Sequence, residues 1–391
     1  MTHEARFRFI ATLFVVALVT FLVPQALALD AIVNCPNGDG GTYPSINAAL
    51  ADVGPSGGGT ITVTGTCQES VALWNLTNIV IQASAPGAAK VDGTPYDAFN
   101  IFHSTVINLV DLDIRGGNGV AAISHTQASI TSCNIHDSGA DGIAGVYVNN
   151  HTDVVIRHST IQNNPGYALY VSNYSSASVT GSTLQGNGSG VYAQNYARVG
   201  FTNQNSIVNN ADYGLYAIDF SRLSFNSSDP ALFSTIQGHT TNGISVARQS
   251  ILVMSGPHVI QGNGSSCGPP DCGGISGVRN ATIRLTSTII SGNQGAGISL
   301  HQGVDMGLMS TTITNNSGDG VRLAQISIGD FLVVDGYPNN IITGNGGASV
   351  YCDKTSLATG NLTGIRKPKC DNIDGSDGHD HGHGGHDHDR D

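Results

Sequence analysis

A short string returns through the chain at intervals of 21 to 30 residues. It reads STIQNN at 159–164, STLQGN at 182–187 and NSIVNN at 205–210, and the last of its later copies ends at Asn345. A motif repeated at this period is the signature of one structural unit stacked many times. The chain is therefore predicted to fold as a solenoid, in which each unit packs mainly on its two neighbours.

The central aliphatic residue of the string sets the register of the units. Three positions later most copies carry Asn, and a Gly followed by alternating apolar and polar residues comes soon after. Short alternating segments predict β-strands, and Asn and Gly supply the turns because both tolerate left-handed backbone angles. The central positions are Ile114, Ile135, Ile161, Leu184, Ile207, Ile236, Ile260, Ile290, Ile313 and Ile342.

These features predict an all-β fold, a single-stranded parallel β-helix solenoid of about ten rungs. A helical solenoid is disfavoured because Gly, Asn, Ser and Thr are abundant and no apolar period of 3.6 is sustained. Over roughly residues 60–352 the chain resembles the right-handed parallel β-helix, or pectin-lyase-like, superfamily. No specific enzyme family matches, because the rungs carry neither the Asn-x-Asp, Asp-Asp, Gly-His-Gly and Arg-x-Lys set of polygalacturonases nor the calcium-binding Asp cluster of pectate lyases.

Four segments are predicted along the chain. Residues 1–28 read as a secretory signal peptide with a basic start, an apolar stretch and a small-residue cleavage site; a retained membrane anchor is the alternative, although the stretch is short for a span. Residues 29–59 form an N-terminal cap with a short helix at 45–53. Residues 60–370 form the β-helix and its C-terminal cap, and residues 371–391 form a disordered His- and Asp-rich tail.

The signal and the cysteines point to an exported protein, either secreted or periplasmic, with no stable membrane insertion after signal cleavage. Seven Cys are present. Cys35 and Cys67 flank the entry to the first rung, Cys267 and Cys272 bracket one loop, and Cys352 and Cys370 straddle the last rung. Cys133 is left over and is predicted to be a small buried thiol. Sequence alone does not fix this connectivity.

The charge is distributed unevenly between the body and the tail. The formal net charge is -12, and seven Asp and one Arg in residues 371–391 supply half of it. The body is close to neutral and has no basic stripe, so nucleic acid is not an expected partner. The resemblance and the outward residues instead favour a polysaccharide.

Aromatic residues recur at two outward positions of neighbouring rungs. They are predicted to bind a glycan, because aromatic rings offer apolar area and phenol groups hydrogen-bond; the alternative is that stacked side chains only stabilise the sheet. The first column holds Tyr147, Tyr170, Tyr192 and Tyr216, and the second holds His151, Tyr174, Tyr196 and Phe220.

Acidic and basic residues gather on the early rungs. Asp113, Arg115, His136 and Asp137 are the candidate catalytic group, because a hydrolase needs two carboxylates and a lyase needs a base and a cation. The alternative is that these charges only solvate an exposed strand. Whether the protein is an enzyme therefore stays open; if it is one, a polysaccharide lyase or glycoside hydrolase is expected.

Two further functions are consistent with the sequence. One is a non-catalytic surface or adhesion module, and the other is a metal-handling exported protein acting through its tail. No cofactor is required by any motif, and a calcium requirement stays undetermined. Imidazole and carboxylate ligands suit zinc, nickel or copper(II), and the tail offers His379, His381, His383, His386 and His388.

A chain ending at Asp371 tests the tail. We expect the full-length protein to bind Ni²⁺ or Zn²⁺ in calorimetry and the shortened protein to lose most of that binding, because the five imidazoles are removed together. Equal affinity of the two proteins would exclude the tail as the metal site.

Overall fold

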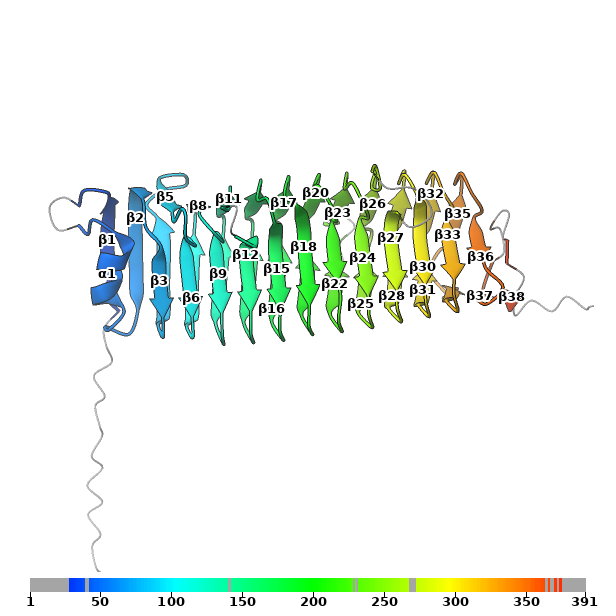
Figure 1. Cartoon of the computed structure of the whole chain (residues 1–391), viewed down its shortest axis with the longest axis horizontal. Helices are drawn as coiled ribbons and strands as arrows, with labels where there is room; N and C mark the ends of the chain where they lie inside the picture. The colour runs from blue at the N-terminus through cyan, green and yellow to red at the C-terminus, as the bar shows by residue number, and fades with distance from the viewer. Residues whose placement is uncertain are drawn as a thin grey trace, which may run out of the picture.

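A computed structural model describes residues 28–38, 42–139, 142–227, 229, 231–266, 272–362, 365, 369–370 and 373–374. The chain winds into an elongated parallel β-solenoid with the helix α1 (Ile46–Val53) at its N-terminal end (Figure 1). The predicted all-β solenoid is thus confirmed. The predicted signal peptide and the tail histidines His379 to His388 lie outside the described residues, apart from Ala28. Among the described residues, no helix combines the length and apolar character that a bilayer crossing requires.

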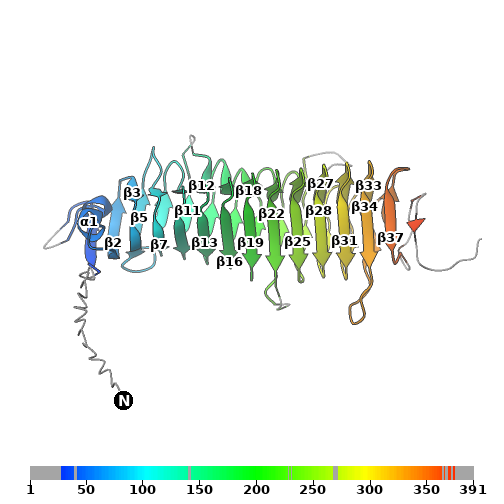
Figure 2. The same ribbon diagram turned by 90° about the horizontal axis from the view of Figure 1, so that it is seen from below.

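Each turn of the coil contributes one strand to each of three rows, and all pairings between rungs are parallel. The first row forms a separate sheet, whereas the second and third rows join into one bent sheet (Figures 1 and 2). The first row contains β3 (Val71–Trp74), β6 (Phe99–Phe102), β9 (Val120–Ile123), β12 (Ala144–Asn149), β15 (Tyr167–Ser172), β18 (Ser189–Gln194), β21 (Leu215–Ala217), β24 (Ile244–Ala247), β27 (Gly273–Val278), β30 (Ala296–His301), β33 (Val321–Ala324) and β36 (Val350–Cys352).

The second and third rows complete the coil. The second row contains β1 (Ala31–Cys35), β2 (Gly59–Cys67), β4 (Thr77–Ala83), β7 (Thr105–Val110), β10 (Gln127–Thr131), β13 (Asp153–Arg157), β16 (Ser176–Thr180), β19 (Arg198–Thr202), β22 (Arg222–Asn226), β25 (Ile251–Ser255), β28 (Thr282–Thr286), β31 (Asp305–Met309), β34 (Ile328–Leu332), β37 (Leu357–Gly360) and β38 (Ile373–Asp374). The third row contains β5 (Ala89–Asp92), β8 (Asp113–Arg115), β11 (Asn134–His136), β14 (Thr160–Gln162), β17 (Thr183–Gln185), β20 (Ser206–Val208), β23 (Thr235–Gln237), β26 (Val259–Gln261), β29 (Ile289–Ser291), β32 (Thr312–Thr314) and β35 (Ile341–Thr343).

The predicted register is confirmed in the third row. Ile114 pairs with Ile135, Ile135 with Ile161, and the alignment continues through every later central residue to Ile342. All of these side chains are buried in one continuous core. The sequence predicted ten central positions, whereas the described residues contain eleven third-row strands. The additional strand is β5, whose Val91 occupies the same column one rung before Ile114.

The Asn column forms a hydrogen-bonded ladder inside the bend between the third and first rows. The Asn187 Oδ1 accepts from the backbone N–H and from the Nδ2 of Asn164, at 3.1 and 2.8 Å. Asn210 repeats both contacts with Asn187. Where His239 replaces Asn, its Nδ1 accepts from the Asn210 N–H at 3.2 Å and its Nε2 donates to the Ile207 carbonyl at 3.0 Å. The neutral imidazole therefore takes the place of the amide.

The other two bends are capped in the same way by buried Ser, Thr and Asn side chains. Between the second and third rows, Ser159 accepts from the Cys133 N–H at 3.1 Å and Ser182 accepts from the Ser159 N–H at 3.2 Å. Between the first and second rows, Ser250 accepts from the Ser221 N–H at 3.0 Å. Each ladder satisfies backbone donors that the bend takes out of the sheet.

The N-terminal end is closed by α1, as predicted. Ser45 caps the helix, and Ile46, Ala49, Leu50 and Val53 are buried on its inner face. The Glu69 carboxylate, at the end of a neighbouring turn, accepts from the Ile46 and Asn47 N–H groups at 2.6 and 3.0 Å. The strand β1 also lies within residues 29–59 and pairs with β2, so the second row begins inside the predicted cap.

The cysteines agree with the predicted pairing where they are described. Disulfides join Cys35 to Cys67 and Cys352 to Cys370. Cys272 is disulfide-bonded, and its predicted partner Cys267 lies outside the described residues. Cys133 is free and buried, and burial raises the pKa of its thiol to about 12. The thiol is therefore protonated and unreactive in the folded protein.

Replacing His239 by Asn tests the ladder through its pH dependence. Burial lowers the pKa of His239 from 6.5 to about 4. The unfolded chain therefore binds more protons below pH 6.5, and the stability supplied by the neutral imidazole is lost progressively as the pH falls toward 4. We expect His239→Asn to keep its stability better than the wild type between these pH values in urea unfolding. The exposed His158→Asn serves as control, and identical pH profiles for wild type and His239→Asn would contradict the assignment.

Candidate functional site

The predicted tyrosine column lies on the outer face of the first row, in strict register. Tyr147 pairs with Tyr170, Tyr170 with Tyr192, and Tyr192 with Tyr216. The rings of Tyr147, Tyr170 and Tyr192 are stacked with centroids 5.3 and 5.4 Å apart, whereas the Tyr216 ring stands edge-on to Tyr192 at 80°. Because stacked rings cover one another's faces, the column presents ring edges and hydroxyls outward.

Two further tyrosines that the sequence analysis missed pack beside this column. The Tyr167 ring lies 4.9 Å from Tyr192, and the Tyr213 ring lies 5.1 Å from Tyr216. Burial raises the pKa of Tyr192 to about 12, and the neighbouring Tyr167 and Tyr216 add to the shift. Burial also raises the pKa of Tyr147, Tyr167, Tyr170 and Tyr213. These phenols and Tyr192 therefore stay neutral near neutral pH and act as hydrogen-bonding groups, not as bases.

The phenol oxygens of the column are oriented by amides on the same strands or the next. The Asn149 Nδ2 donates to the Tyr147 oxygen at 3.0 Å, and the Gln194 Nε2 donates to the Tyr170 oxygen. A phenol oxygen that accepts in this way still carries its own proton. The two hydroxyls are therefore held in place with a donor available to a ligand.

An open apolar hollow continues the same face toward the N-terminus. It measures about 260 Å³ and is lined by Trp74, Phe102 and Ile123, with Asn100, Ile101 and Ala121 completing it. The Trp74 side chain is 63% exposed, and no aromatic partner covers its ring among the described residues. This part of the site was not predicted from the sequence, because β3 and β6 precede Ile114, the first central residue of the repeat.

The second aromatic column is a stack of rings at the bend between the first and second rows. Tyr174 lies 4.8 Å from Tyr196, and Phe220 lies 5.0 Å from Tyr196, with nearly parallel planes. The stack extends farther than predicted, through His151 to His125 and His103. These residues all occupy left-handed backbone positions, so the bend itself sets their common direction.

Three of the four candidate catalytic residues, Asp113, His136 and Asp137, come together on the outer face of the third row. The His136 Nε2 lies 3.1 Å from the Asp113 Oδ1, and the His136 Nδ1 lies 2.8 Å from the Asp137 Oδ2. The Asn134 Nδ2 donates to the other Asp113 oxygen at 2.9 Å. Both ring nitrogens of His136 are thus engaged by carboxylates, so neither nitrogen is free to contact a substrate in this arrangement.

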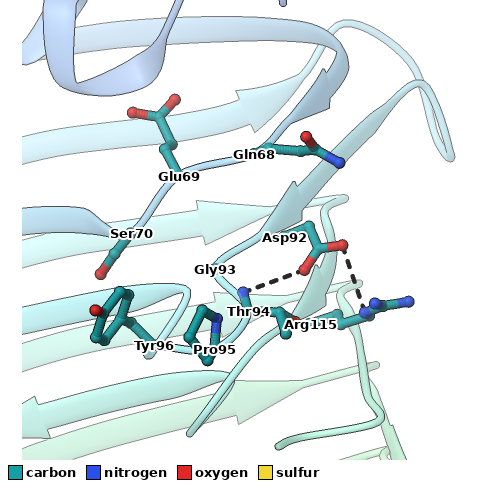
Figure 3. A pocket seen from close by; sticks show the side chains of 9 residues that line it. All are labelled: Gln68, Glu69, Ser70, Asp92, Gly93, Thr94, Pro95, Tyr96 and Arg115. Carbon is teal, nitrogen blue, oxygen red and sulfur yellow. Dashed lines mark hydrogen bonds and ion pairs between the residues drawn. The ribbon is translucent and has the colours of Figure 1, made fainter.

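Arg115 points away from this group toward an acid that the sequence analysis did not single out. Its Nε lies 3.4 Å from the Asp92 Oδ2, and Asp92 also accepts from the Thr94 N–H at 3.2 Å (Figure 3). Although burial raises the pKa of Asp92, the Thr94 hydrogen bonds and the Arg115 and Lys90 charges together lower it. The pair lines a hollow of about 470 Å³ beside Tyr96 and Glu69.

The structure therefore separates the predicted site residues onto two faces. The tyrosine column belongs to the first row, whereas Asp113, Arg115, His136 and Asp137 belong to or follow the third. The only set of three metal-ligating side chains found among the described residues is Cys35, Cys67 and Glu69. Its two cysteines form a disulfide, so this set offers no thiolate to a metal.

Comparisons with known proteins agree with the fold. The family described as "Right handed beta helix region" matches residues 96–230. The A-module of the Azotobacter vinelandii mannuronan C-5 epimerase AlgE6 is 15% identical with a TM-score of 0.52, over 78% of this chain and 94% of that one. The AlgE4 A-module of the same organism is 15% identical with a TM-score of 0.51, over 76% and 95%. No curated protein matches the sequence. The chain is thus a right-handed parallel β-helix, as the resemblance implied.

Proposed function

We propose that the protein binds a polysaccharide along the outer face of its first row of strands. The observation that carries the proposal is two groups of aromatic side chains on this face, which together span a line of seven strands from β3 to β21. Trp74 and Phe102 share one register column on β3 and β6. The tyrosine column begins on β12, two positions to one side, and β9 between the two groups carries no aromatic residue. At about 4.8 Å per rung this line is about 29 Å long, which suits several units of an extended polymer.

The two halves of this face have different roles in the proposal. Trp74 and Phe102 leave apolar ring surface open beside a hollow, and such surface matches the apolar face of a sugar ring. The tyrosine column offers oriented hydroxyls and ring edges, so it contributes hydrogen bonds to the sugar hydroxyls. A polymer lying along the solenoid axis contacts both halves.

The comparisons and the cysteines support the proposal in general terms. The similar structures include A-modules of two mannuronan C-5 epimerases, enzymes named for a polysaccharide. Disulfides at both ends of the coil fit an oxidising compartment outside the cytoplasm. Because the candidate catalytic side chains satisfy one another on a different face, we favour binding without cleavage as the primary function.

Replacing Trp74 by Ala tests the open ring surface. We expect retention of the protein in polysaccharide affinity gels to weaken by about tenfold in Kd, because one stacking ring is lost. Trp74→Phe keeps an aromatic face and should retain most of the affinity. Tyr337→Ala removes an exposed ring far along the chain, in the loop before β35, and should have no effect. Unchanged retention of Trp74→Ala on every polymer bound by the wild type would reject this half of the face.

Cleavage of the bound polymer is a second candidate function. The observation in its favour is that His136 lies within hydrogen-bonding distance of Asp113 and Asp137, an acid–base arrangement beside the Arg115–Asp92 pair. As a hydrolase the group would use two carboxylates. As a lyase it would require the imidazole to give up one of its carboxylate contacts before accepting a proton.

His136→Gln tests cleavage, since Gln keeps hydrogen bonding but not proton transfer. If the group is catalytic, we expect the release of new reducing ends or unsaturated products to fall by at least about 100-fold. The screen should include acidic and neutral glycans with calcium present. Wild-type protein that releases no product, or a variant as active as the wild type, would rule out cleavage by this group.

A further inference from the structure

We infer that Arg198 and Arg222 form a binding site for an oxyanion, the carboxylate or sulfate group of an acidic glycan. The two residues begin β19 and β22 in the second row, and they are paired directly in register. Both side chains are exposed on the outer face. Neighbouring parallel strands lie about 4.8 Å apart, so the two side chains leave adjacent rungs at paired positions, and both line the same hollow.

Neither arginine has an acidic partner among the described residues. Arg115, Arg248, Arg284 and Arg322 each form an ion pair with an aspartate, in a body that carries few charges. Within the same described part of the chain, Arg198 and Arg222 form none, and neither lies over an aromatic ring. Like charges directly opposite each other on adjacent strands destabilise a sheet. An anion bound between them removes that repulsion.

The hollow that the two arginines line measures about 480 Å³. Its floor is Gly200, which has an extended backbone and pairs with Ser224 on the next strand. A Cβ at Gly200 would meet only the Ser224 Oγ, at 3.6 Å, so the backbone does not require glycine at this position. The missing side chain is what keeps the hollow open.

The walls of the hollow suggest what carries the anion. Guanidinium groups bind carboxylate and sulfate in a bidentate geometry. Phe220, which is 50% exposed, lines the same hollow and ends the stack of rings at the bend. An oxyanion beside an apolar ring surface matches an acidic sugar. Nucleic acid fits poorly, because it requires an extended basic surface and the chain has a net charge of -12.

This site is separate from the face proposed to bind polysaccharide, and it does not depend on that proposal. The tyrosine column and Trp74 lie on the first row, whereas the arginine pair lies on the second, beyond the bend. The inference adds a preference for an acidic polymer that the uncharged aromatic face does not supply.

Three variants of the full chain test the site against polygalacturonate, dextran sulfate and neutral dextran at about 150 mM salt. Arg198→Gln/Arg222→Gln removes both charges. Gly200→Val fills the hollow and keeps both charges. Arg157→Gln removes a single exposed arginine that lies alone on the second row and ends β13, so it controls for the loss of one unpaired surface charge. Melting temperatures verify that each variant is folded, and titration calorimetry measures affinity.

We expect the double variant and Gly200→Val to bind the acidic polymers at least about tenfold more weakly, with Arg157→Gln changed less than about twofold. Equal binding by the double variant and the wild type would overturn the inference. Weaker binding by the double variant alone, with Gly200→Val unaffected, would also overturn it, because non-specific attraction between positive and negative charges would then explain the binding. Inorganic sulfate that binds as tightly as the polymers would overturn the assignment to a glycan. Trp74→Ala, measured in parallel, reports separately on the first-row face.

Discussion

The coil depends on buried side chains that cap its bends. Within the rows, backbone groups pair from strand to strand, but every turn has three bends where the backbone leaves the sheets. At many of these bends a buried Asn, Ser, Thr or His side chain accepts from an N–H of the preceding rung, as Asn187 does for Asn164 and Ser182 does for Ser159. An unpaired buried N–H would cost about 1–3 kcal/mol at each such place. The regular ladders therefore determine where the chain turns. Because the turns repeat at the same place on each rung, the outward side chains of successive strands line up.

The ladders explain why the fold could be predicted so fully from the sequence. Leu184 and Asn187 have counterparts at fixed positions on the neighbouring rungs, because the core and the ladder each require one kind of residue per rung. The first turn escaped detection because it lacks that signature: Val91 is followed by Gly93 and Thr94 instead of the Asn column. The bend carrying Ser159 escaped for a different reason, since Ser is common throughout the chain and does not stand out as a column.

The site was less predictable than the fold. Alignment of rungs placed Tyr147 and Tyr170 side by side, but ring orientation also depends on Tyr167, which begins β15 and packs against Tyr170 and Tyr192. Whether a ring offers its face or its edge is a packing outcome that spacing does not encode. The arginine pair could not be predicted from the sequence either. An exposed Arg indicates a binding site only when the residue paired with it on the next strand and the nearby glycine are known.

The translational regularity of the rungs has a consequence for how such a chain changes over evolutionary time. His239 occupies an Asn position and keeps the backbone N–H contacts to the rungs on both sides, so the bend accepts more than one residue type without losing those contacts. Duplication or deletion of one whole repeat would therefore lengthen or shorten the rod while leaving both end caps intact. The exposed faces would then lengthen or shorten by one rung at a time. The number of ligand units that they can contact would change with them.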